Sequence, residues 1–232
     1  RVVVLVDALN QFERTDQAKY VNWLPGLIPE NSKFIFTAIH GDETENLSKR
    51  KGITIEELKD IKEPDARKII EVLCKRYHKE LNKEAIEILL KKKRDDGSYS
   101  YSNPLWLTMV IDDFILMDED DFGLMKELVG TPEEKLIQLL IKSAEKIPPN
   151  VEGMYEYVFN RSRKFGEEFV NSILSYIGIS RKGLRESDLE NLITEYEKQK
   201  WNNLNFASFR RYFRNHIVQK GELGLWDFRH VK

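Results

Sequence analysis

The chain has 232 residues, enough for one large domain or two modest ones, each with its own core. Apolar residues make up 41% of it, which excludes a disordered chain, and the net charge is only −2. This near balance argues against a general nucleic-acid or membrane-surface binder, because such binding needs a basic excess. There is one cysteine, Cys74, and no signal peptide or membrane-length apolar run. We therefore expect a cytoplasmic protein without an internal disulfide, with Cys74 buried in a helix.

The first part of the chain has the pattern of a parallel α/β sheet. Residues 2–6 form an unbroken apolar run ending at Asp7, which predicts a strand covered on both faces. A helix is expected around residues 16–24 and a second strand over residues 33–38, together one βαβ unit. Because the apolar strand follows Arg1 directly, we expect the chain to be a fragment or to lack its first part.

Helical periodicity replaces the strand pattern after Gly41. Start signals such as the capping sequence Thr131-Pro132-Glu133-Glu134 support several of the predicted helices. The polar stretch 94–103 is expected to be a loop. The helices are predicted over residues 54–60, 65–79, 83–94, 104–117 and 132–147.

Two prolines, Pro148 and Pro149, end the last of these helices, and a second helical group follows. It is predicted over residues 154–163, 166–176, 185–196 and 206–218, with strand character over 223–231. Helices followed by a pair of strands give the order of a winged helix, with glycines in its turn. The predicted divisions are therefore residues 1–50, 51–147 and 148–232, and the whole is mostly α.

Asp7 carries the main chemical signal. A carboxylate at the carboxyl end of a buried parallel strand lies where ligands bind in open α/β sheets. This is the Walker B arrangement, which holds Mg²⁺ opposite nucleotide phosphates, although an ordinary strand end gives the same pattern. The chain contains no G-x-x-x-x-G-K-[ST] motif, so we expect it to bind nucleotide weakly or not at all by itself.

The strings VVVLVDALNQFE and WLPGLIPENSKFIFTAIHGD resemble the NACHT-like branch of the STAND ATPases. The resemblance implies the C-terminal part of an α/β P-loop NTPase core, followed by a helical lid and a winged helix. It implies ATP or ADP and Mg²⁺ as cofactors. Asp7 falls at the metal-organising and catalytic position, Gln11 at a second catalytic position, Asn10 beside it, and Thr37 at the sensor position near the γ-phosphate.

This sequence departs from the family at the same positions. Asn10 and Gln11 are amides where many members have acids, and an amide cannot act as a general base. The arginine that often follows the sensor residue is absent. Hydrolysis is then expected to be slow, with ATP acting as a conformational switch. The competing readings are a helix cap for Asn10 and Gln11 and a simple strand end for Thr37.

Two later residues extend the resemblance. Pro104 opens a predicted helix as in the Gly-x-Pro-like element whose proline packs on the adenine, but proline is common at any helix start. The ending LGLWDFRHVK resembles the wing strand whose histidine reaches the β-phosphate of ADP, which places His230 in that role. The alternative is an exposed basic pair, Arg229 and His230, on an edge strand.

The resemblance implies a nucleotide-dependent signalling switch of the kind found in antiviral and innate immune defence. A protein ligand sensed outside this chain would open the ADP form, and protomers would assemble into a homo-oligomer that activates an effector domain, also outside it. The alternatives are an inactive helical scaffold, a nuclease-type effector, and a transcription regulator that binds DNA phosphates through Arg210, Arg211 and Arg214. The histidines and acids show no zinc or calcium spacing.

Overall fold

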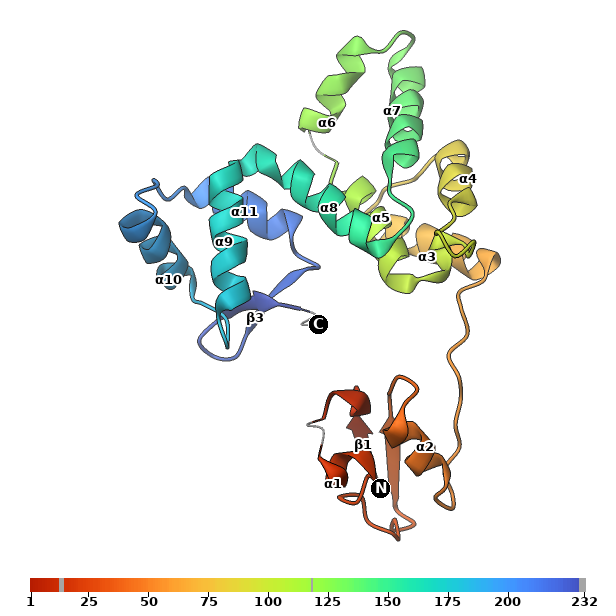
Figure 1. The fold of residues 1–232 in the computed structure, drawn as a ribbon. Coiled ribbons are helices and arrows are strands. Elements are labelled where there is room, and N and C mark those ends of the chain that lie inside the picture. Colours follow the sequence, from red (N-terminus) through yellow and green to blue (C-terminus); the bar gives the residue numbers. More distant parts are fainter. Residues whose placement is uncertain (13–14, 118, 230–232) are drawn as a thin grey trace. The chain divides into compact units, whose positions relative to one another are not determined.

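The computed structural model describes residues 1–12, 15–117 and 119–229. It divides into two compact units, Arg1–Lys59 and Asp60–Lys232, and most of its regular structure is helical (Figure 1). Among the described residues, no helix has the length and apolar character needed to cross a bilayer.

The first unit is built on two parallel strands, as predicted. β1 (Val2–Val6) pairs with β2 (Ser32–Phe36) in the register Val2↔Ser32 through Val6↔Phe36. The short helices are η1 (Leu9–Gln11), α1 (Asp16–Lys19) and α2 (Asp42–Ser48).

Within this unit only one face of the strand pair is covered, which differs from the prediction of a strand covered on both. The covered face packs on a small core made by Leu9, Val21, Leu24 and Leu47. On the other face Val3, Leu5 and Ile35 are 59%, 66% and 52% exposed. The alternation follows from the two-residue period of a strand.

The helix predicted over residues 16–24 ends at Lys19 instead. Val21 takes a left-handed conformation, with φ 53°, and is fully buried. The Arg50 guanidinium donates hydrogen bonds to the carbonyl oxygens of Val21 and Leu24, at 2.6 and 2.9 Å. These contacts hold a turn that buries Val21 and Leu24, and tertiary packing therefore overrides the helical periodicity.

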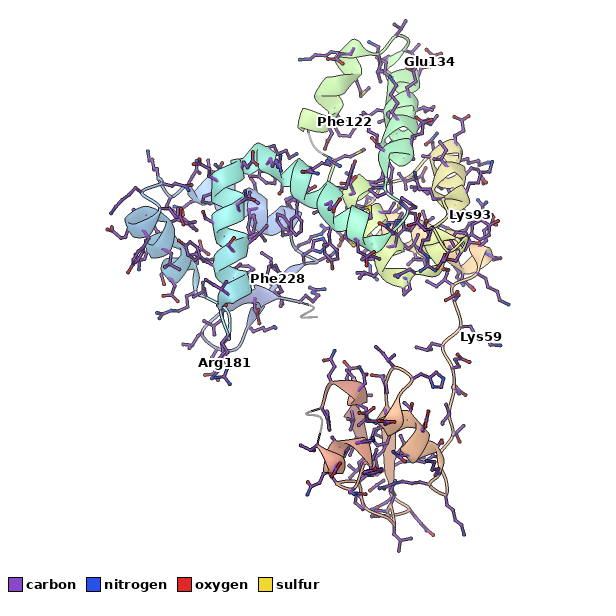
Figure 2. The ribbon with its side chains drawn as sticks, viewed as in Figure 1. Lys59, Lys93, Phe122, Glu134, Arg181 and Phe228 are labelled. Carbon is purple, nitrogen blue, oxygen red and sulfur yellow. The ribbon has the colours of Figure 1, made fainter. Side chains whose placement is uncertain are left out.

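The helix predicted over residues 54–60 is absent, and the chain there is extended; Lys59 lies on this stretch in Figure 2. Ile55 is 60% exposed and Leu58 is 95% exposed. A helix of two turns is marginal in water without a packed apolar face, and these side chains find none.

The second unit is helical up to its last residues. Its first group consists of α3 (Glu63–Arg76), α4 (Lys83–Lys91), η2 (Ser100–Ser102), α5 (Pro104–Ile115), α6 (Glu119–Gly123), η3 (Leu124–Glu127) and α7 (Pro132–Lys146). Its second group consists of α8 (Val151–Ser162), η4 (Arg163–Phe165), α9 (Glu167–Ile179), α10 (Glu186–Asn191), the π-helical η5 (Leu192–Tyr196) and α11 (Asn203–Tyr212). The predicted capping box joins Thr131 and Glu134 at the start of α7.

The core of this unit is centred on α5, which is apolar on nearly every side. Trp106, Leu107, Val110 and Ile111 are at most 1% exposed. The indole N–H of Trp106 donates to the carbonyl oxygen of Pro148, at 2.7 Å. A helix that is apolar all round belongs in the interior, and one core cluster includes residues of both helical groups, with Cys74 buried in it as predicted.

The chain ends in a hairpin next to α9. β3 (Ile217–Lys220) pairs antiparallel with β4 (Leu225–Phe228), and Leu184 bridges to Trp226 through two backbone hydrogen bonds of 3.0 and 2.7 Å. The helix predicted over residues 206–218 is shorter, because α11 ends at Tyr212 and the chain enters β3 at Ile217. Along the chain α9 is followed by the bridging residue Leu184, then by α10 and α11, and then by the hairpin.

Candidate functional site

Asp7 and Thr37 meet at the carboxyl ends of β1 and β2. The Thr37 hydroxyl donates a hydrogen bond to the Asp7 carboxylate. The oxygen of this hydroxyl also accepts a hydrogen bond from the backbone N–H of Ala8, at 2.8 Å. The Thr37 backbone continues the pairing of the strands, because its N–H donates to Val6 and its carbonyl accepts from Leu9. Parallel pairing in this register places both side chains at one edge of the sheet.

Ala8 turns the chain sharply after Asp7. It has φ 51° and ψ 55°, a left-handed conformation that costs a non-glycine residue about 1–2 kcal/mol. The turn starts η1 and carries Asn10 over the end of β2, where its side-chain oxygen accepts the N–H of Ile39 at 3.1 Å. Backbone strain beside a polar cluster is a feature of functional sites.

Asn10 and Gln11 behave differently from a helix cap. The Asn10 side chain binds the segment that follows β2, at Ile39. Gln11 is exposed at the end of η1 and makes no side-chain hydrogen bond with the described residues. The residue before η1, Ala8, provides no side-chain cap. The structure therefore brings Asp7, Asn10 and Thr37 together and leaves Gln11 at the margin.

The edge formed by these residues is open and polar. Asp7 and Thr37 are exposed, while Leu9, two residues after Asp7, is fully buried. The second carboxylate oxygen of Asp7 accepts no hydrogen bond from the described residues, so it could ligate a cation. The described residues hold no group of three or more histidines, cysteines or acids placed to bind a metal. One carboxylate suits Mg²⁺, which takes one or two protein ligands and completes its shell with phosphates and water.

The other two predicted positions lie elsewhere in the chain. Pro104 is exposed at the first position of α5, where the Asn103 side chain accepts the N–H groups of Leu105 and Trp106 at 2.9 and 3.3 Å. This matches its role as a helix start; its role at an adenine stays a prediction. His230 lies outside the described residues, and Arg229 before it is exposed.

The arginines proposed for DNA contact are mostly engaged within the chain. Arg210 pairs with Glu186 at 3.4 Å and lies over the rings of Phe206 and Trp226. Arg214 is held in a similar way, because it pairs with Asp112 of α5 and lies 4.6 Å from the centre of the Tyr77 ring.

Arg211 is the exposed member of the three. The predicted set therefore does not project together from one solvated face, as phosphate contacts would require.

The second unit contains a buried ionic cluster that was not predicted from the sequence. Arg161 of α8 donates to Asp113 of α5 and to Asp121 of α6, each at 2.5 Å. Burial raises the pKa of Asp113 to about 6 and that of Tyr157 to about 12. The available signal was an acid inside the apolar sequence PLWLTMVIDDFI, since a charge in such a helix needs a partner.

No protein-family model matches the chain, and no solved structure matches it. A TPR repeat-containing protein of Dictyostelium discoideum is 24% identical over 198 residues, which are 83% of this chain and 11% of that protein. The chain thus spans about a ninth of the length of this relative.

Proposed function

We propose that this chain is a segment of a STAND-class ATPase, running from the Walker B strand to a winged helix. The observation that carries the proposal is the contact between Thr37 and Asp7 at the carboxyl ends of two parallel strands. A carboxylate oriented by the residue that ends the neighbouring strand is what a metal-organising and sensor pair requires.

Each residue at this edge would have a separate role in binding MgATP or MgADP. Bound Mg²⁺ would neutralise phosphate charge. Asp7 would hold the metal through the oxygen that Thr37 leaves open, and Thr37 would fix the carboxylate orientation. Asn10 is tethered to the Ile39 N–H and cannot take a proton. The cluster therefore suits binding and slow turnover, and Gln11, at the margin of the cluster, would orient water.

The exposed apolar face of the first unit supports a larger core. Strands of a parallel sheet are ordinarily covered on both faces, yet Val3, Leu5 and Ile35 are more than half exposed within this unit. The extended segment with exposed Ile55 and Leu58 adds further apolar surface. Additional core structure, including the phosphate-gripping loop that this sequence lacks, would cover such surfaces.

The last three helices and the hairpin support a winged helix. In this proposal α9, α10 and α11 are its helices, Leu184 forms its first short strand, and β3–β4 is the wing. Arg214 pairs with Asp112 of α5, so the domain packs on the lid helices. His230 would contact ADP in the resting state, and a protein ligand would release it so that protomers oligomerise and act on an effector.

The test uses the longer protein that contains this chain. Turnover of MgATP and binding of ADP are measured for the parent, for Asp7→Asn, and for Asp16→Asn, whose exposed acid begins α1 and makes no hydrogen bond to the cluster. We expect Asp7→Asn to lower Mg²⁺-dependent turnover by about tenfold or more and Asp16→Asn to leave it unchanged. Equal turnover in all three, or no nucleotide binding by the parent, would refute the proposal.

The engaged arginines favour packing over DNA recognition, and a mobility-shift titration separates the two. The parent and an Arg210/Arg211/Arg214 triple alanine variant are titrated with duplex DNA over a range of salt. Steeply salt-dependent binding that the triple variant loses would establish the regulator function instead.

A further inference from the structure

Arg161 connects three helices of the second unit. Its guanidinium lies between Asp113 on α5 and Asp121 on α6, and its side chain is 19% exposed. Figure 1 shows α6 and α7 projecting together from the helices below, with the near end of α6 above α8. The Asp121–Arg161 pair thus ties this projecting element to the unit's core.

Asp113 is the most deeply buried group of the cluster, and Lys164 is a second cation that acts on it. Two carboxylates share one guanidinium, and Asp113 is only 3% exposed. One oxygen of Asp113 accepts from Arg161, whereas its other oxygen is buried and accepts no hydrogen bond from the described residues. Removing a charge from water without full compensation is costly, so the buried site favours taking up a proton.

Several other ionisable groups surround Asp113. Tyr157 and Arg161 face Asp113 from α8, Asp121 from α6, Lys164 from η4 and Tyr212 from α11. Asp112 and His216 line the same small cavity as Asp113. The tyrosines do not titrate near neutrality, because burial raises the pKa of Tyr157 to about 12 and raises that of Tyr212 further.

We propose that Asp113, Arg161 and Asp121 form a proton-sensitive latch that sets how firmly α6 is held on α8. With Asp113 ionised, Arg161 is shared between two carboxylates. With Asp113 neutral, the full charge of Arg161 is directed at Asp121, and α6 is held more firmly. The bistable element is the projecting α6–η3 segment, which the latch joins to the core.

The direction of the pH effect follows from the raised pKa of Asp113. Its pKa rises from 3.8 in the unfolded chain to about 6 in the folded one, mainly through burial. The folded state then binds the proton more tightly, so this group's contribution to stability is greatest in acid. It declines as the pH rises from about 4 and levels off above about 6.

The test is amide hydrogen exchange on the whole chain between about pH 5 and pH 8, corrected for the intrinsic exchange rate. We expect protection of residues 119–127, relative to α7, to fall about three- to tenfold as the pH rises, with its midpoint near the pKa of Asp113. In Asp113→Asn, which resembles the protonated acid, protection should stay high throughout. Asp112→Asn is the matched control, because its side chain contacts Arg214 instead, and it should keep the step.

Three results would overturn the latch. The first is protection of residues 119–127 that does not change with pH. The second is a pH step that survives in Asp113→Asn, because a group other than Asp113, such as His216, would then be responsible. If Asp113→Asn does not fold, the carboxyl carbon of Asp113 is followed by NMR in the unmodified chain. A titration midpoint near the ordinary value of an aspartate would contradict the proposal, and one near that of a raised pKa, coincident with the exchange step, would support it.

Discussion

The hydroxyl of Thr37 binds the carboxylate of Asp7 across the ends of two strands, and the same oxygen satisfies the N–H of Ala8. Thr37→Val keeps the shape of the side chain but removes both hydrogen bonds. Because the site is exposed, we expect the first unit to lose only about 1 kcal/mol of unfolding free energy, measured by urea titration. Thr37→Ser retains the hydroxyl and should lose less; an equal loss in both variants would show that the methyl group matters instead.

Gly183 lies against the backbone of β4. A Cβ added there would lie 2.5 Å from the carbonyl oxygen of Trp226, and φ is +84°. We expect Gly183→Ala to displace the bridge between Leu184 and Trp226 and to cost the second unit about 3 kcal/mol or more. Gly221→Ala is the control, because φ is +66° but no atom lies within 4 Å, and it should cost about 1 kcal/mol. Similar urea midpoints for the two variants would contradict the clash.

Trp106 anchors the start of α5 to the turn at Pro148. Trp106→Phe removes the indole N–H that donates to the Pro148 carbonyl and leaves a gap at a position that is 1% exposed. We expect a loss of about 1–3 kcal/mol in the unfolding free energy of the second unit, followed by circular dichroism. Trp23→Phe, at a position 38% exposed, should change stability by less than about 0.5 kcal/mol. A reversed order would refute this account.

The extended segment between the units should be the first site of proteolysis. Lys51, Lys59 and Lys62 are exposed, and residues 53–62 lie outside regular secondary structure. We expect brief trypsin treatment to cut here and to release two fragments that resist further digestion, identified by mass spectrometry. First cuts within α3 or α7 would show that the units are less stable than their packing indicates.

The sequence predicted the elements that carry strong local signals. β1 follows from its apolar run, and α7 from its capping box at Thr131 and Glu134. The proximity of Asp7 and Thr37 also follows from sequence, because parallel strands bring their carboxyl ends to one edge. The hydrogen bond between the Ile39 N–H and the Asn10 side chain does not follow from the sequence, since it depends on the left-handed turn at Ala8.

The errors arise where tertiary contacts outweigh local periodicity. Residues 54–60 have a helical pattern but no surface to pack on, while Val21 leaves its predicted helix to enter a core. The π-helical η5 within the predicted helix 185–196 carries no local signal. Arg161 binds Asp113 and Asp121, which are 48 and 40 residues away from it along the chain, so no pattern in the sequence pairs them.

The uncovered side of the strand pair has a consequence for how substitutions are tolerated. If Val3, Leu5 and Ile35 remain in water, each can be replaced by threonine with little effect, because threonine forms strands equally well. If another layer of protein rests on them, the same replacements reduce the yield of folded protein in its native setting. Comparing the tolerance of these three positions in this chain alone with their tolerance in a longer protein of the proposed architecture therefore reports directly on what lies above the sheet.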